Sequence, residues 1–132
     1  MRSEKMRRIG RVCAGLGLVA GAIALCGAGD AAGDNPKFTV KEVMEKAHKG
    51  KTSLAKTAID GKATKEELTQ LLEYYQSMAM QKPKKGDLAD WNARNKALVG
   101  STQEMLDGDK AGLPAYKKAV DCKACHKLHK ED

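Results

Sequence analysis

The sequence predicts an all-α domain, folded as an antiparallel four-helix bundle. Beyond the first third of the chain, alanine, leucine, lysine, glutamate and methionine predominate, and all are good helix formers. Strand formers are few there, since valine and isoleucine occur only at Val40, Val43, Ile59, Val99 and Val120. Glycine and proline divide this part into four segments with helical periodicity and short connections, a pattern typical of such bundles.

The first two segments cover residues 39–60 and 64–82. The first places its apolar residues near one face, at Val40, Val43, Met44, Ala47, Leu54 and Ala58. Because Gly50 and Lys51 interrupt this pattern, we expect the first helix to kink or divide there. The second segment opens with Thr64 and Glu67 at the spacing of a capping box. Its apolar face consists of Leu68, Leu71, Leu72, Tyr75 and Ala79.

The last two segments cover residues 87–107 and 113–130. The apolar face of the third consists of Leu88, Trp91, Leu98, Val99, Thr102 and Leu106. The fourth begins with Pro114 near its first turn, where a missing N–H costs little. We expect a single helix in this segment, with one face made of Ala115, Ala119, Cys122 and His126. The small alanines on that face leave room for a ligand beside the cysteine and the histidine.

Residues 1–33 have the three parts of a secretory signal peptide. Five basic residues precede Val12, the stretch 12–29 is apolar and uncharged, and small residues continue to Gly33. Cleavage after Ala28 or Ala31 would leave one exported, periplasmic domain, residues 34–132. An uncleaved anchor is the alternative, although glycine and alanine weaken the hydrophobicity of the stretch. Lipidation at Cys26 is a lesser alternative, because Leu25 is bulky where a small residue is required.

Removal of this leader changes the charge and the cysteine count of the chain. The remaining domain holds 19 basic and 15 acidic residues, a net charge of +4 against +7 for the whole chain. Arg94 is the only arginine left in it. Nucleic-acid binding is therefore not expected, since it calls for a dense basic stripe with arginine and stacking aromatics. Two of the four cysteines remain, Cys122 and Cys125.

The stretch DCKACHKLHK, residues 121–130, holds both cysteines and two histidines. A dithiol switch requires a βαβ setting that is not predicted here. Zinc is compatible with the ligand types, but Cys122, Cys125, His126 and His129 are crowded within one helix. A plain disulfide leaves the adjacent histidine unexplained. Attachment of haem c explains every part: two thioethers, at Cys122 and Cys125, and a proximal iron ligand, His126.

The sequence CKACHKLHK on the last helix resembles the class II c-type cytochromes, the cytochrome c′ family. A second match is VKEVMEKAHKG, residues 40–50, which is similar to the first helix of that family. The family commonly has an aromatic and then a basic residue at the positions of His129 and Lys130, so the aromatic is absent here. The resemblance covers about residues 37–132 and implies a four-helix bundle enclosing one covalent haem, with Met44 facing its distal side.

The distal side of the haem decides the function that the resemblance implies. With Met44 as sixth ligand, the protein is an exported monohaem electron carrier; with an open iron site, it binds nitric oxide or carbon monoxide. Met44 is the leading candidate for this ligand because it lies on the buried face of the first segment, and a packing role alone is the alternative. We expect His48 at the surface and His129 exposed near the haem edge. Further sulfur candidates, without support from the family, are Met78, Met80 and Met105.

Lysines surround the predicted attachment site, at Lys117, Lys118, Lys123, Lys127 and Lys130. They form either an ordinary solvated helix face or a positive rim that steers an acidic redox partner. A homodimer is also compatible with the sequence. No substrate pocket is indicated, so we do not expect an enzyme. A zinc-binding helical module remains a third interpretation.

Overall fold

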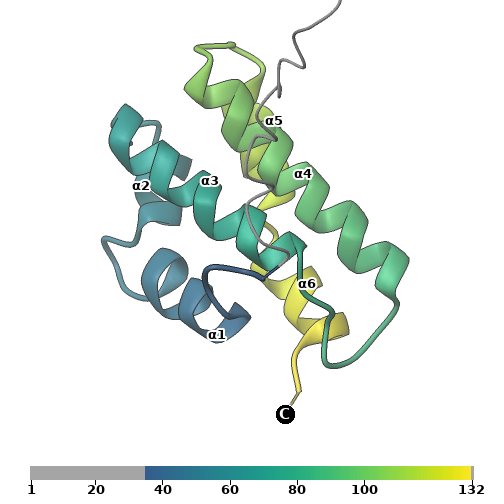
Figure 1. Cartoon of the computed structure of the whole chain (residues 1–132). Coiled ribbons are helices and arrows are strands. Elements are labelled where there is room, and N and C mark those ends of the chain that lie inside the picture. Colours follow the sequence, from purple (N-terminus) through teal and green to yellow (C-terminus); the bar gives the residue numbers. More distant parts are fainter. Residues whose placement is uncertain (1–34, 132) are drawn as a thin grey trace, which may run out of the picture. The chain divides into compact units, whose positions relative to one another are not determined.

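Residues 35–131 are described by the computed structural model, and all of the regular secondary structure in this range is helical (Figure 1). The elements are α1 (Val40–Val43), the π-helical turn η1 (Met44–His48), α2 (Leu54–Ile59), α3 (Lys65–Ala79), α4 (Leu88–Leu106), α5 (Gly112–Ala119) and α6 (Cys122–His129). The predicted all-α class is confirmed. The predicted signal peptide, residues 1–33, lies outside the described range.

The first predicted segment divides at Gly50, as expected. Thr39 caps α1 through a capping box with Glu42, and the π-helical turn continues it to His48. The helix ends at Lys49, whose backbone is extended, and Gly50 then adopts a φ of +100°, a conformation that side-chain-bearing residues rarely adopt. Ser53 starts α2 by accepting a 3.3 Å hydrogen bond from the Lys56 N–H. The segment is therefore two short helical pieces.

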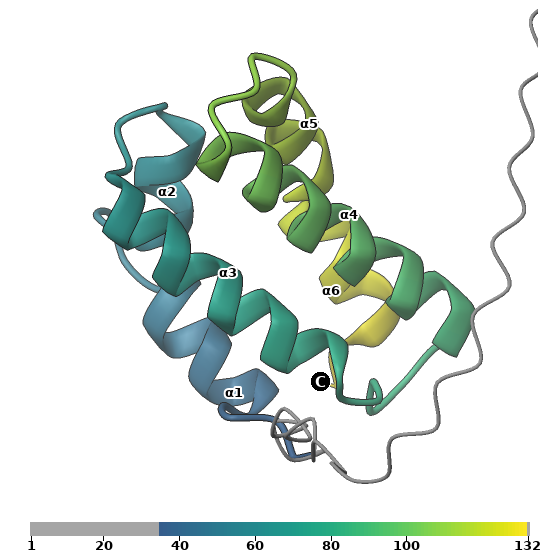
Figure 2. The same ribbon diagram turned by 45° about the horizontal axis from the view of Figure 1, so that its top comes forward.

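Helices α3 and α4 lie side by side along their lengths (Figure 2). The predicted capping box of α3 is present, with Thr64 and Glu67 each bonding the backbone N–H of the other. Asp87 caps α4 by accepting a 2.8 Å bond from the Asp90 N–H. Helices α1 and α2 contact α3, whereas α5 and α6 contact α4.

The prediction of a single helix over residues 113–130 is wrong. The backbone leaves the helical region at Val120, where ψ is 45°. Asp121 then caps a new helix, because its side chain accepts a 3.0 Å bond from the Ala124 N–H. The two cysteines and both histidines of the motif therefore lie on a separate short helix, α6.

The core lies where the inner faces of these helices meet. Its largest fully buried side chains include Tyr75 and Tyr116, whose hydroxyl groups bond each other at 2.6 Å. Most of the predicted core residues are buried, among them Val43, Ala47, Leu68, Leu71, Trp91 and Leu98. Leu88 is an exception: it is 44% exposed, because it stands in the first turn of α4 beyond the packed face.

Across residues 35–131, none of the helices combines the length and the apolar character needed to cross a bilayer.

Candidate functional site

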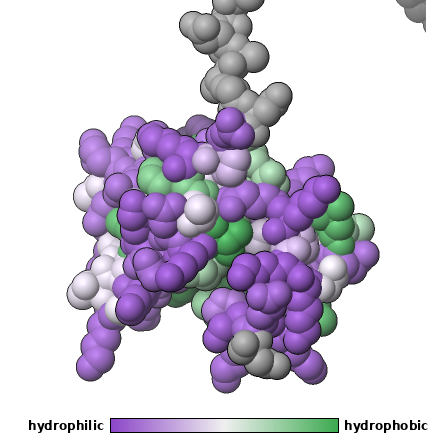
Figure 3. All heavy atoms as spheres, turned by 60° about the horizontal axis from the view of Figure 1, so that its bottom comes forward, coloured by the Kyte–Doolittle hydropathy of each residue, from purple (hydrophilic) through white to green (hydrophobic). Residues whose placement is uncertain are grey.

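Two cavities share walls between η1 and α6. Their volumes are about 550 and 270 Å³, and three residues line both of them: Met44, Cys125 and His126. The remaining apolar wall of the smaller cavity includes Met78, Leu98, Ala119 and Val120. Figure 3 views the end of the domain that carries α1 and α6, where apolar surface shows between hydrophilic segments. Volumes of this size are typical of sites for small molecules and cofactors.

The two cysteines of the motif stand on the wall of the smaller cavity. They are three residues apart in α6, so both lie on the same side of the helix. Both are free thiols; Cys122 is exposed and Cys125 is half-buried. Burial raises the pKa of the Cys125 thiol, and the nearby Arg94 opposes this only in part. Both sulfurs are therefore available at the edge of an apolar cavity.

The iron ligands expected from the sequence face the same space from two elements. His126, on α6, is exposed and lines both cavities. Met44, on η1, is half-buried and lines both as well. Residues 44 and 126, which lie 82 positions apart in the sequence, thus line the same cavities. The π-helical turn that carries Met44 is a rare element, and such turns are frequent at functional sites.

The prediction that His48 lies at the surface is wrong. Its Nε2 atom is buried on the wall of the smaller cavity and has no hydrogen-bond partner. The ring packs against Tyr75, with 5.7 Å between the ring centroids. Burial, with a smaller contribution from His126, lowers the pKa of His48 to about 4. The imidazole is therefore neutral at neutral pH. Sequence reasoning placed His48 on the correct side of the helix but too near its edge.

The other methionines differ in their access to the cavities. Met78, on α3, is 2% exposed and lines the smaller cavity. Met80 is 54% exposed, and Met105 lines neither cavity. Met78 therefore joins Met44 as a sulfur that faces the site, whereas Met80 and Met105 do not.

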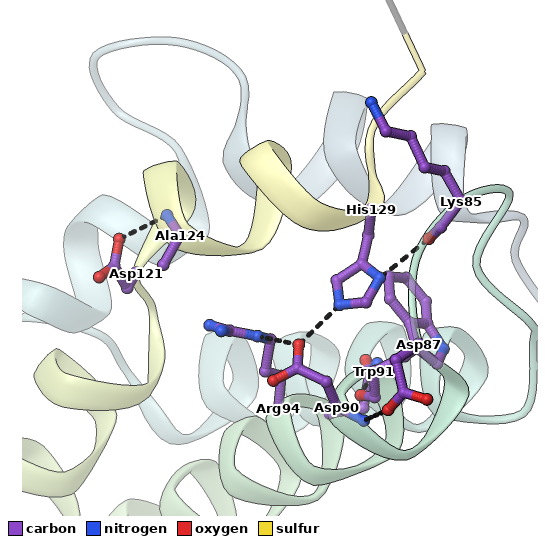
Figure 4. Close-up of polar contacts among 9 residues, drawn as sticks. Lys85, Asp87, Asp90, Trp91, Arg94, Asp121, Ala124 and His129 are labelled. Atoms are coloured by element: carbon purple, nitrogen blue, oxygen red, sulfur yellow. Dashed lines mark hydrogen bonds and ion pairs between the residues drawn. The ribbon is translucent and has the colours of Figure 1, made fainter.

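His129 is buried, so the prediction of an exposed ring at the haem edge is wrong (Figure 4). Its Nδ1 lies 3.0 Å from the Lys85 carbonyl oxygen, and its Nε2 lies 2.8 Å from Oδ2 of Asp90. Both partners only accept hydrogen bonds, so a ring nitrogen of His129 bonds its partner where it carries a proton. The ring also meets Trp91 edge to face, at 5.3 Å between centroids. This arrangement, the His129 clamp, fixes α6 to α4.

Asp90 is the shared acceptor of the His129 clamp. Its Oδ2 also accepts a 2.6 Å bond from Nε of Arg94, and Arg94 and His129 together hold the pKa of the Asp90 carboxyl below its ordinary value. Because both ring nitrogens of His129 contact oxygen atoms of the protein, His129 is not free to act as a ligand in the four-ligand zinc site considered above. Across residues 35–131, no three His, Cys, Asp or Glu side chains cluster closely enough to hold a metal ion.

Positive charge surrounds the two cavities. The five lysines of the predicted rim are all exposed, at Lys117, Lys118, Lys123, Lys127 and Lys130. Lysines also line the larger cavity, at Lys41, Lys82, Lys84 and Lys130. An anionic group that entered the larger cavity would therefore meet cationic side chains at its edge.

No protein-family model, curated protein or solved structure matches this chain.

Proposed function

We propose that this protein is an exported monohaem c-type cytochrome, similar to class II cytochromes, that carries single electrons. The observation that carries the proposal is the placement of two free thiols and the following histidine on the wall of an apolar cavity that Met44 faces from another element. Each of these groups has a role in haem binding, and the spacing Cys-x-x-Cys-His is that of c-type haem attachment.

The residues of the site fit a haem in four respects. Cys122 and Cys125 present their sulfurs on one side of α6. The walls beyond them are apolar, and the lysines of the larger cavity suit the propionate groups. The larger of the two adjoining volumes, about 550 Å³, lies within the range of cofactor sites. The buried, unpaired Nε2 of His48 faces the same space, which is unfavourable in an empty protein and points to a ligand.

In this proposal the bound haem supplies a one-electron couple, and the chain controls it through the residues of the site. Cys122 and Cys125 would hold the group by thioether bonds, and His126 would supply a nitrogen ligand to its iron. Met44 would supply a sulfur ligand, which would favour a low-spin centre and a raised reduction potential. The four helical stretches, α1 with α2, α3, α4, and α5 with α6, then act as an antiparallel bundle around the group. The lysine rim steers an acidic redox partner to it.

A second candidate function has a specific observation in its favour. The smaller cavity is lined by Met78, Leu98, Ala119 and Val120, so its distal region has room and apolar walls for a small gas. If Met44 only packs there, the iron stays open to nitric oxide or carbon monoxide. The same residues hold the haem in both cases, and only the sixth position separates the two functions.

The proposal is tested on the full chain, exported by a host that attaches c-type haem. We expect the haem to remain with the denatured polypeptide through acid–acetone extraction, since two thioether bonds hold it. Cys122→Ala together with Cys125→Ala should release it, whereas Lys123→Ala, between them on the same helix, should retain it. A colourless chain after extraction of the unaltered protein would overturn the proposal. A low-spin spectrum with the far-red methionine–iron band favours the carrier, and a high-spin spectrum with rapid carbon monoxide binding favours the gas binder.

A further inference from the structure

His48 is the one residue of the site whose buried polar atom has no partner and no role in the function proposed above. Within the described part of the chain, two buried side-chain polar atoms lack a hydrogen bond, Nε2 of His48 and Oδ1 of Asn95. Asn95 lines neither cavity, and its amide nitrogen is bonded to the Trp91 carbonyl oxygen. A buried polar atom without a partner destabilises the folded state. The orphaned nitrogen of His48 therefore calls for an occupant of the cavity.

The surroundings of His48 indicate what that occupant is. The residue lies four positions after Met44 in η1, and both line the smaller cavity with His126 and Cys122. The ring is held in place against Tyr75. A neutral imidazole with its proton on Nδ1 presents a lone pair at Nε2, which is the form in which histidine binds iron through that atom, and Nε2 of His48 has no partner in the protein. The charged residues of this cavity, Arg94 and Asp121, are not hydrogen-bonded to it.

We propose that His48 is a second distal ligand of the haem iron, taking the sixth position through Nε2 when the sulfur of Met44 leaves it. The inference rests on the haem-binding function proposed above. The exchange breaks one iron–sulfur bond and forms one iron–nitrogen bond, with no electron transferred and the remaining ring proton kept on Nδ1. Since methionine ligation raises the reduction potential, the exchange lowers it. The distal face thus holds two alternative ligands, one turn apart on one helix.

The test uses holoprotein of four kinds: the unaltered chain, Met44→Ala, His48→Phe, and the double variant. His48→Phe keeps an aromatic ring against Tyr75 and removes the nitrogen. Met44→Leu, which preserves apolar volume, replaces Met44→Ala if the latter yields no folded holoprotein. Covalent haem content is measured first, as a pyridine haemochrome, followed by electron paramagnetic resonance and near-infrared spectra of the oxidised forms. The reduction potential and the affinity for added imidazole are measured on the same samples.

We expect Met44→Ala to stay low-spin with a bis-nitrogen signature and a lowered potential. The double variant should be high-spin and should bind added imidazole at least about tenfold more tightly than Met44→Ala, because no internal ligand competes. His48→Phe should keep the methionine signature of the unaltered protein. If the unaltered protein itself shows a bis-nitrogen signature that His48→Phe removes, then His48 is the sixth ligand of the iron in the unaltered protein, in place of Met44.

Two results would overturn the inference while leaving haem binding intact. One is a high-spin Met44→Ala form that matches the double variant in its spectrum and imidazole affinity. The other is a methionine–iron band that persists in Met44→Ala, which would identify Met78 as the sulfur ligand. Absence of covalent haem from the unaltered protein would instead refute the proposed function, and the inference with it, at the first measurement.

Discussion

Substituting alanine for Gly86 tests how α6 is held against the α3–α4 loop. Gly86 has a φ of +89°, and a Cβ atom added there would lie 2.5 Å from the Leu128 carbonyl oxygen and 2.7 Å from Nδ1 of His129. Contacts this short require movement of the backbone of α6 or of the histidine ring. The Gly86→Ala variant is therefore expected to disturb the His129 clamp as well as the local backbone.

The size of the effect follows from two contributions. Alanine in a left-handed conformation costs about 1–2 kcal/mol. Displacing His129 from the Lys85 carbonyl oxygen, which it contacts at 3.0 Å, costs about 1–3 kcal/mol, the cost of leaving a buried polar group without its partner. We therefore expect Gly86→Ala to lower the free energy of unfolding by about 2–5 kcal/mol, the sum of the two contributions. That is a large part of the stability of a small domain.

Gly108→Ala provides the matched control for this measurement. Gly108 has a similar φ of +78°, but a Cβ atom there would meet nothing within 4 Å. It should therefore cost only the conformational contribution, about 1–2 kcal/mol. Urea denaturation of both variants, at equal haem content and followed by circular dichroism, gives the difference directly. Equal losses in the two variants would refute the reasoning, since the close approach of α6 to Gly86 would then contribute nothing.

Three further predictions concern stability. Tyr75→Phe should lower the free energy of unfolding by about 1–3 kcal/mol, because it leaves the buried Tyr116 hydroxyl without its 2.6 Å partner. In a double-mutant cycle, the variant with both Tyr75→Phe and Tyr116→Phe should lose less stability than the two single variants together. Strict additivity of the two losses would contradict the role of this hydrogen bond. Thr64→Ala should cost about 1 kcal/mol in urea denaturation through loss of the α3 cap, whereas the exposed Thr69→Ala should cost clearly less. The folded-state pKa of Asp90 is lowered, so its carboxylate contributes stability that is present above the ordinary value of 3.8 and is lost as the pH falls through the folded pKa. The unfolding free energy of Asp90→Asn should therefore fall less than that of the unaltered chain below pH 3.8, and parallel curves would count against the pairing.

Much of the fold was predictable because its signals are local in the sequence. Thr64 and Glu67 stand at capping-box spacing, and Gly50 interrupts its helix in the sequence as it does in the structure. The division at Val120 was missed because residues 115–130 contain no glycine or proline. The signal that the sequence does contain is the β-branched Val120 followed by Asp121, which is a good N-cap residue. Helical periodicity alone does not detect this signal.

The site was predictable where it depends on one short sequence motif. It was unpredictable where it depends on contacts between residues that are far apart in the sequence. The structure brings Cys122, Cys125 and His126 to the same cavities as Met44, as the sequence predicted. His48 was misplaced because an α-helical spacing was assumed, whereas a π-helical turn holds more residues and brings positions four apart closer to one face. His129 was misplaced because its partner Asp90 lies 39 residues earlier, beyond the reach of any local pattern.

The break between α5 and α6 has a consequence for the order of folding. A helix of eight residues is not stable alone in water, so α6 depends on its tertiary contacts for its helical form. The polar contacts of its buried histidine lie 39 and 44 residues earlier, in α4 and in the loop before it. Helix α6 therefore completes its polar contacts only once α4 and the loop before it are in place. Until then, the segment that holds both thiols remains an unanchored end of the chain, accessible to whatever must react with it.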